Sequence, residues 1–136
     1  MSSTKIIHHF DRIVRRIDAG MHRHGRALDT ERIGAHAVMV LTQLDRIAPA
    51  PAHVLVDVMG RDPSQMTRGI NLLEEKGFVT RTVSDSDRRV RNLDLTPAGK
   101  AYVARLDAVL IGIVEDILEP LNDAERKALS TLLDRL

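Results

Sequence analysis

Three arginines lie within four positions of one another in a polar stretch between two apolar runs. They are Arg88, Arg89 and Arg91, in the sequence "VSDSDRRVRNLDLTPAGK" of residues 83–100. An arginine guanidinium is always charged, and its planar fork of donors matches the oxygens of phosphates and base edges. The cluster is therefore suited to binding a polyanion, although a charged turn standing alone usually does no more than face solvent.

The runs on either side of the cluster predict a two-stranded hairpin. Residues 78–83 and 90–95 are β-prone, and the polar turn "SDSDRR" connects them. The arginines are then expected at or near the hairpin tip. Asp87 is close enough to Arg89 to hold it by a charge-assisted hydrogen bond. Arg91 has the same strand parity as the two leucines that follow it, so we expect it to lie along the body of the hairpin rather than at its tip.

A second candidate binding element lies directly upstream, in "GRDPSQMTRGINLLEEKGF". Asp62 suits the N-cap of a helix, Pro63 suits its first position, and Gln65 stands where a capping box could close. The helix is predicted from Pro63 to Lys76, with Gly77 after its last turn. The inward stripe is expected to be Met66, Ile70 and Leu73. The outward polar face is expected to be Ser64, Gln65, Thr67, Arg68 and Asn71.

The rest of the chain must position these two elements, and its apolar spacing predicts further helices. The predicted helices span residues 6–21, 36–47, 53–59 and 97–120, with a last one from about Asn122 to the end. The proline-containing segment 48–52 is expected to be a connector. The fold class is thus mainly α with a small β-hairpin.

Composition limits the function classes. The 136 residues suit one domain, and the absence of cysteine excludes disulfides and thiolate metal sites in this chain. No apolar run of membrane-spanning length or secretory signal is present, so we expect a cytoplasmic protein without a membrane partner. The net charge is +1, but residues 1–28 carry six basic and two acidic side chains and residues 61–100 carry eight and six. Positive charge therefore gathers in two regions of the chain.

A capped helix followed by a basic hairpin is what a winged helix-turn-helix requires. The major groove of duplex DNA admits one α-helix, and an arginine on an adjacent loop can enter the narrower minor groove. In this geometry the arginines at the hairpin tip would bind in or beside the minor groove.

The segment from Asp62 to Lys100 resembles the MarR family of bacterial transcription regulators. It reads Asp-Pro-Ser, then Thr-Arg, Leu-Glu-Glu-Lys-Gly, and a wing pattern that ends in Leu-Thr-Pro-Ala-Gly. The resemblance is close over residues 53–100, and the flanking helices share it in length and pattern. The residues that carry the wing signature are Asp87, Arg89, Leu95, Thr96 and Gly99.

The resemblance implies an architecture and a function. It implies a homodimer in which the first and the last two helices intertwine, with a DNA-binding lobe in each subunit and, in many members, a small ligand between lobe and dimer region. We therefore predict a single MarR-like domain over residues 1–136, with a winged-helix lobe at about 34–97 and dimerisation helices at about 4–28 and 98–136. The predicted function is a sequence-specific, ligand-responsive repressor that binds a pseudo-palindromic operator on double-stranded DNA. The predicted DNA-binding residues are Ser64, Gln65, Thr67, Arg68, Asn71, Asp87, Arg88, Arg89 and Arg91.

Other classes of function remain as alternatives. A winged-helix fold can also serve as a protein-protein interaction module without DNA specificity. Such a module would more often expose aromatic residues, and this chain has one tyrosine and two phenylalanines. Enzymatic activity is not expected, because we find no glycine-rich phosphate loop, cysteine nucleophile or strand-to-helix serine.

Neither a metal nor a cofactor is predicted. The six histidines are His8, His9, His22, His24, His36 and His53. His22 and His24 stand two apart on a predicted helix, so they cannot face one ion together, and surface positions explain the histidines better. A small anionic or aromatic effector is a further expected partner, because the first helix carries Arg12, Arg15, Arg16 and His22, although the same side chains could equally face solvent or phosphate.

Overall fold

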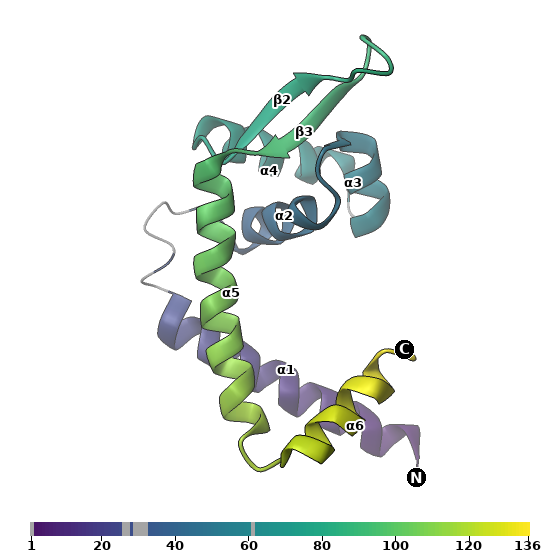
Figure 1. Cartoon of the computed structure of the whole chain (residues 1–136), viewed down its shortest axis with the longest axis vertical. Helices are drawn as coiled ribbons and strands as arrows, with labels where there is room; N and C mark the ends of the chain where they lie inside the picture. The colour runs from purple at the N-terminus through teal and green to yellow at the C-terminus, as the bar shows by residue number, and fades with distance from the viewer. Residues whose placement is uncertain (1, 26–27, 29–32, 61) are drawn as a thin grey trace. The chain divides into compact units, whose positions relative to one another are not determined.

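The computed structural model describes residues 2–25, 28, 33–60 and 62–136, and within them the chain forms six helices and three short strands (Figure 1). The chain divides into two compact units. One contains residues 1–26 and 107–136, and the other contains residues 27–106. None of the described helices is long and apolar enough to cross a membrane.

The second unit consists of helices packed with a small sheet. Its elements are α2 (Gly34–Ile47), β1 (Ala50–Pro51), α3 (Ala52–Met59), α4 (Pro63–Glu75), β2 (Val79–Val83), β3 (Arg91–Leu95) and the first part of α5 (Pro97–Leu118). Figure 1 shows β2 and β3 as a hairpin that extends beyond the helices and ends in a loop. The fold class and the predicted hairpin are confirmed.

The sheet has a third strand that the sequence did not indicate. The antiparallel order is β1-β3-β2, and Ala50 pairs with Leu93 in β3. The segment 48–52 was predicted to be only a connector, and this prediction was wrong. The strand is two residues long and contains Pro51, which is tolerated because β1 lies at the edge of the sheet.

The core of this unit joins α2, α3, α4, the sheet and the start of α5. Its largest fully buried side chains are Val40, Leu41, Leu44, Leu55, Met66, Leu73, Leu93 and Tyr102. Met66, Ile70 and Leu73 of α4 are all buried, which confirms the predicted inward stripe. The polar face of α4 must therefore point outward.

Helices α2 and α4 approach closely at Gly69. A Cβ at this position would lie 3.3–3.4 Å from the ring of His36 and from Val40. Nε2 of His36 lies 3.2 Å from the carbonyl oxygen of Gln65, and because a carbonyl only accepts, Nε2 carries the proton. His36 is thus a helix-packing residue. Among the described residues, no three His, Asp or Glu side chains form a group that could hold a metal ion.

The Leu-Thr-Pro-Ala-Gly sequence joins the wing to α4 and α5. The hydroxyl of Thr96 donates to the carbonyl oxygen of Gly77 at 2.6 Å and accepts from the backbone N–H of Gly99 at 3.1 Å. The backbone N–H of Thr96 donates to the carbonyl oxygen of Phe78. A Cβ at Gly99 would overlap that same oxygen, so only glycine permits this approach.

The first unit consists of α1 (Ser3–Gly25), the second part of α5 and α6 (Asp123–Leu133). Gly20 is the buried residue of α1, and a Cβ there would come within 2.8–3.0 Å of the Ile113 side chain. Asn122 begins α6 with a capping box closed by Glu125, as expected for a helix predicted to start near Asn122. Arg126 donates to Glu115 at 2.6 Å, which holds the start of α6 against α5.

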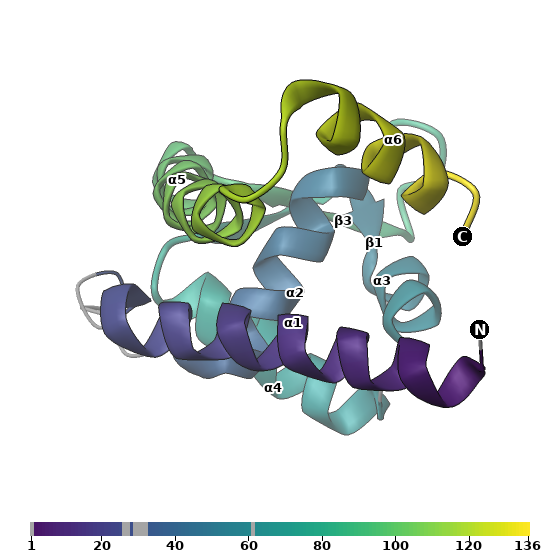
Figure 2. The ribbon, with the colours of Figure 1, turned by 90° about the horizontal axis from the view of Figure 1, so that it is seen from below.

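Much of the apolar surface of the first unit is uncovered. Figure 2 shows α6 lying apart from α1, and no residue of α6 is buried. The large apolar side chains that are exposed in this unit are Ile6, Ile7, Phe10, Ile13, Val14, Ile111, Val114, Leu132, Leu133 and Leu136. Ile7 and Val14 are 63% and 62% exposed, although they belong to the apolar stripe of α1. A surface of this kind on a small protein indicates an interaction site.

Candidate nucleic-acid interface

The N-terminus of α4 is held by Asp62 and Ser64. The Asp62 carboxylate accepts from the backbone N–H and from the hydroxyl of Ser64, both at 2.9 Å. The backbone hydrogen bond from Ser64, with its hydroxyl hydrogen bond second, lowers the pKa of the Asp62 carboxyl below its ordinary value. The side chain of Gln65 forms no capping box among the described residues, contrary to the prediction, because Asp62 bonds one position earlier, at Ser64.

The outward face of α4 carries the polar side chains that the sequence placed there. Ser64, Gln65, Thr67, Arg68 and Asn71 are all exposed. The hydroxyl of Thr67 donates to the carbonyl oxygen of Pro63 at 2.9 Å, so its lone pairs remain free for an external donor. The face therefore offers donors, acceptors and one cation within three turns of helix.

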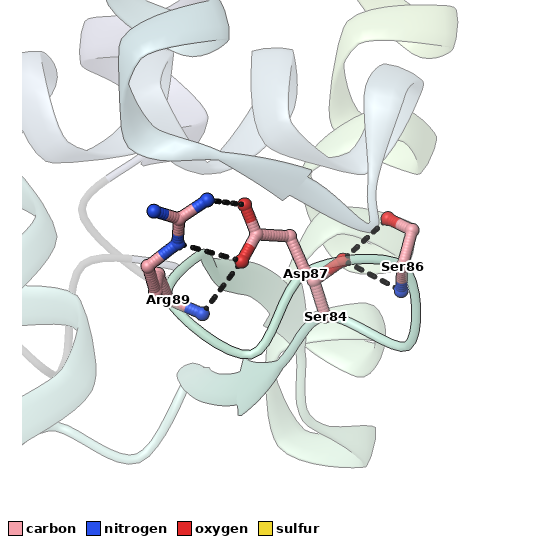
Figure 3. Close-up of polar contacts among 4 residues, drawn as sticks. All are labelled: Ser84, Ser86, Asp87 and Arg89. Atoms are coloured by element: carbon pink, nitrogen blue, oxygen red, sulfur yellow. Dashed lines mark hydrogen bonds and ion pairs between the residues drawn. The ribbon is translucent and has the colours of Figure 1, made fainter.

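The hairpin tip holds Arg89 against Asp87 (Figure 3). Asp87 Oδ1 accepts from the backbone N–H and from Nε of Arg89 at 3.0 and 3.2 Å, and Oδ2 accepts from the outer guanidinium nitrogen at 3.4 Å. These bonds, the backbone one first, lower the pKa of the Asp87 carboxyl. The predicted pair is confirmed. Because the Arg89 side chain is 91% exposed, the pair does little for stability and instead fixes the direction of the guanidinium.

A second contact shapes the same loop. The hydroxyls of Ser84 and Ser86 lie 3.0 Å apart, and Ser84 is buried (Figure 3). The backbone N–H of Ser84 donates to the carbonyl oxygen of Val90, which closes the loop at its base. The tip is thus an ordered turn rather than a loose connection.

The other two arginines differ in their position. Arg88 is exposed in the turn, whereas Arg91 is the first residue of β3 and pairs with Val83. Arg91 shares its face with the buried Leu93 and Leu95, as its parity predicted, but its own side chain is exposed. It therefore lies on the strand, where we expected it, and not in the turn.

Sequence reasoning missed Arg81 in β2. Its Nε donates to Glu74 Oε2 at 2.8 Å, and its Nη2 donates to Asn71 Oδ1 at 3.1 Å. The wing strand is thereby bonded to the polar face of α4. The signal was available in the sequence, because Glu74 and Arg81 are opposite charges on either side of the tight turn at Gly77.

The first unit has a pocket of about 100 Å³ between α1 and α5. Its charged lining residues are two cations and one anion, Arg16, Arg23 and Asp116. Its remaining walls are His24, Ala19, Gly20, Ile113 and Ile117. Arg16 belongs to the basic group that the sequence indicated, whereas Arg23 was not singled out.

The buried helices, the small antiparallel sheet, the exposed capped helix and the basic loop together define a winged helix-turn-helix. Residues 35–90 match the model of the MarR family, and the resemblance predicted from the motifs is confirmed. These residues are fewer than half of the chain, and they contain the capped helix, the strands β1 and β2 and the basic turn described above.

Other proteins are similar to this chain in sequence or in fold. A protein of Thauera aromatica described as a transcriptional regulatory protein for the hcr operon is 39% identical over 82 residues, which are 60% of this chain and 49% of the relative. The matched segment thus spans about half of that relative. The apo form of wild-type MarR from E. coli has a TM-score of 0.74 at 21% identity, covering 99% of this chain and 96% of that one. BpsR of Bordetella bronchiseptica, whose DNA binding is regulated by 6-hydroxynicotinic acid, has a TM-score of 0.70 at 23% identity, covering 96% and 97%.

Proposed function

We propose that the protein is a sequence-specific transcriptional repressor that binds a pseudo-palindromic operator as a homodimer. The observation that carries the proposal is the pairing of two exposed features in one unit. These are the polar outward face of α4 and the Arg89 guanidinium, which Asp87 holds at the wing tip. Such a regulator acts where the chromosome is, so we place it in the cytoplasm.

The α4 helix is suited to the major groove. Its N-terminal turns expose Ser64, Gln65, Thr67 and Arg68, and the N-terminal turns are the part of such a helix that meets base edges. Met66 and Ile70 anchor its other side in the core, so the polar face is presented by a rigid element. Side chains in this position can hydrogen-bond with bases and phosphates.

The wing is suited to the minor groove. Arg89 is almost fully exposed, and three hydrogen bonds to Asp87 limit its freedom before DNA is bound. A held arginine loses less conformational entropy on binding than a free one. The narrow minor groove of A·T-rich DNA has a strong negative potential, which attracts such a cation. Arg88 and Arg91 are exposed nearby and suit phosphate contacts.

The uncovered apolar surface of the first unit supports the homodimer. The stripe of α1 and the exposed leucines of α6 would be costly to leave in water. A second copy of the same chain offers the same surfaces, and a two-fold axis lets each bury the other. A two-fold protein in turn accounts for a two-fold operator.

The alternative, a protein-binding winged helix, is less well supported. Phe78 and Tyr102 are buried in the core with ring centroids 5.2 Å apart, and Phe10 belongs to the exposed apolar stripe of the first unit. The exposed face of α4 therefore has no aromatic side chain, although aromatic residues are enriched in protein interfaces.

Selection of bound sequences from random duplex DNA tests the function directly. We expect enrichment of a site with two-fold symmetry, its half-sites separated by about one helical turn, or roughly 34 Å. Enrichment should disappear when Gln65 and Arg68 are both replaced by alanine. A population that stays random with the wild-type protein would contradict the proposal and favour the protein-binding alternative.

Replacing Arg89 by alanine should weaken binding to many sequences without changing the selected core site. We expect the affinity to fall by about 10-fold or more and the preference for A·T-rich flanks to weaken, because the arginine senses groove width and potential. Titrations at several salt concentrations check this, and the slope of log affinity against log salt should fall by about 0.9 for each phosphate that the variant no longer neutralises.

The matched control for this titration is Arg15→Ala, which removes an equal charge from the first unit, where Arg15 is paired with Asp11. If Arg89→Ala bound the selected operator as tightly as the wild type at every salt concentration, the wing tip would be only a solvated turn.

Replacing both Ile7 and Val14 by aspartate should dissociate the dimer. Burying unpaired carboxylates is strongly unfavourable, so we expect the dimer dissociation constant to rise at least about 100-fold. Size-exclusion chromatography with light scattering measures the mass at several concentrations. The control is a pair of aspartates at His8 and Arg12, which are also exposed on α1 but outside the apolar stripe. A double variant that remained as dimeric as this control would remove α1 from the interface.

The pocket of the first unit supports a small aromatic acid as the effector. Its volume of about 100 Å³ is of the order of a cavity that admits one aromatic ring, and Arg16 and Arg23 would hold the carboxylate. We expect benzoate to bind more tightly than neutral benzamide in calorimetry. Arg16→Gln or Arg23→Gln should weaken benzoate by about 10-fold, whereas Arg15→Gln should not. Equal binding of both probes would argue against an anion site.

A further inference from the structure

We propose that Arg81 is a positioning residue that turns the side-chain amide of Asn71 so that its nitrogen faces DNA. The proposal rests on the function proposed above and adds a constraint on one position of α4. Two observations carry it. The Nη2 nitrogen of Arg81 donates to Asn71 Oδ1 at 3.1 Å, and its Nε donates to Glu74 Oε2 at 2.8 Å.

The orientation of the amide follows from the chemistry of its partner. The two ends of an asparagine amide are hard to tell apart by shape alone, so hydrogen-bond partners must assign them. A guanidinium has donors and no acceptor. The atom of Asn71 that faces Arg81 must therefore be the oxygen, and the –NH₂ group points the other way.

Arg81 is itself held in place. Glu74 lies one turn beyond Asn71 on α4, and its carboxylate accepts from Nε. The backbone of Arg81 is fixed in β2, where it pairs with Leu93 of β3, a fully buried residue of the core. The Arg81 and Glu74 side chains are only 36% and 43% exposed, so the bond is partly shielded from solvent. The amide of Asn71 thus meets a donor of fixed position.

Asn71 belongs to the face that we propose for DNA. It lies seven residues after Ser64 and four after Thr67, and that spacing puts the three side chains on one side of a helix. All three are exposed. The –NH₂ group of Asn71 is the part of this amide that remains for an external partner.

This orientation restricts what Asn71 can read. The bidentate contact of asparagine with adenine uses the amide oxygen and nitrogen together on N6 and N7. With its oxygen directed to Arg81, Asn71 acts as a donor and pairs with an acceptor on DNA. That acceptor is a base-edge atom such as guanine O6 or N7, or else a phosphate oxygen, and the two sources are distinguished by experiment.

The test combines the free protein with a double-mutant cycle on the selected operator. In the free protein, NMR of nitrogen-15-labelled samples reports the side-chain –NH₂ signals of Asn71 and the Nε–H of Arg81. Lysine has no planar fork and cannot bond with both partners in this way, so Arg81→Lys should shift the Asn71 signals while the charge is kept. Far-UV circular dichroism and thermal melting check that each variant is folded.

The cycle compares wild type, Asn71→Ala, Arg81→Lys and the double variant. If Arg81 acts through Asn71, Arg81→Lys should weaken operator binding by about 2- to 10-fold in the wild-type background and have no further effect in Asn71→Ala. Asn71→Asp keeps an acceptor for Arg81 but removes the donor, so it should bind as weakly as Asn71→Ala or worse. Glu75→Gln removes an equal charge from an exposed position of α4 that is outside the Arg81 contacts, and it serves as the control, expected within about 2-fold of wild type.

Operator variants separate the two sources of the acceptor. A base contact predicts that discrimination at one base pair falls by about 5- to 100-fold in Asn71→Ala while the salt slope is kept. A phosphate contact predicts an even weakening over all sequences and a salt slope that stays unchanged, since Asn71 carries no charge. Either result with a coupled cycle supports the donor orientation.

Other results overturn the proposal. Independent effects of the two substitutions would show that Arg81 does not act through Asn71, and unchanged Asn71 signals in Arg81→Lys would show that the hydrogen bond is absent in solution. Operator binding by Asn71→Ala equal to wild type would also refute it. Failure of the proposed function itself looks different, because then the wild-type protein selects no DNA while the NMR signature persists.

Discussion

The geometry of the wing depends on the junction between the end of α4, the sheet and the start of α5. Gly77 ends α4 with a positive φ of 79°, and the backbone N–H of Phe78 donates back to the carbonyl oxygen of Leu73. The hydroxyl of Thr96 bonds with Gly77, and its backbone N–H bonds with Phe78. The two ends of the hairpin are thus fastened to one turn of chain, and a wing fastened in this way has a defined direction relative to α4.

This constraint explains why the signature residues of the wing are of two kinds. Thr96 and Gly99 serve the junction, because Gly99 leaves room for the carbonyl oxygen of Phe78. Asp87 and Arg89 lie at the tip, where they bond with each other and the Arg89 side chain is exposed. Arg81 connects the two regions, since it lies on the wing strand and reaches the face of α4. The proposed DNA-binding surface is made from the wing and α4. Its rigidity therefore depends both on the junction at Gly77 and on the hydrogen bond between Arg81 and Asn71.

The sequence predicted those features that depend on residues close together in the chain, such as helix caps and glycine turns. The caps of α4 and α6 and the turn at Gly77 have side-chain or glycine signals, and the structure has those helices where we expected them. The strand β1 carried no such signal, because a two-residue edge strand is defined by its partner, Leu93, and not by its own composition. The bond between Arg81 and Asn71 joins residues ten positions apart, and the predicted turn at Gly77 made opposite charges of Glu74 and Arg81 neighbours without indicating that Arg81 also reaches Asn71. The Asp62 cap shows the same limit, because either the amide of Ser64 or that of Gln65 was in reach of its side chain.

The apolar stripe of α1 was also visible in the sequence, and the structure shows that a single chain leaves Ile7 and Val14 of this stripe exposed. This matters for the proposed function, because one winged-helix lobe makes few contacts with DNA. A single module of this size typically buries only about 600–1,000 Å² of protein surface on DNA, and nonspecific phosphate contacts supply much of its affinity. When two lobes are joined rigidly, binding of the first lobe to its half-site gives the second lobe a high effective concentration at the other half-site. The preferences of both lobes for operator over other DNA are then combined. In the proposed homodimer, the exposed side chains of Ile7, Val14 and Leu133 would join the two lobes. They would then matter as much to operator recognition as the polar face of α4, because a single lobe of this size discriminates poorly among the many competing sites of a chromosome.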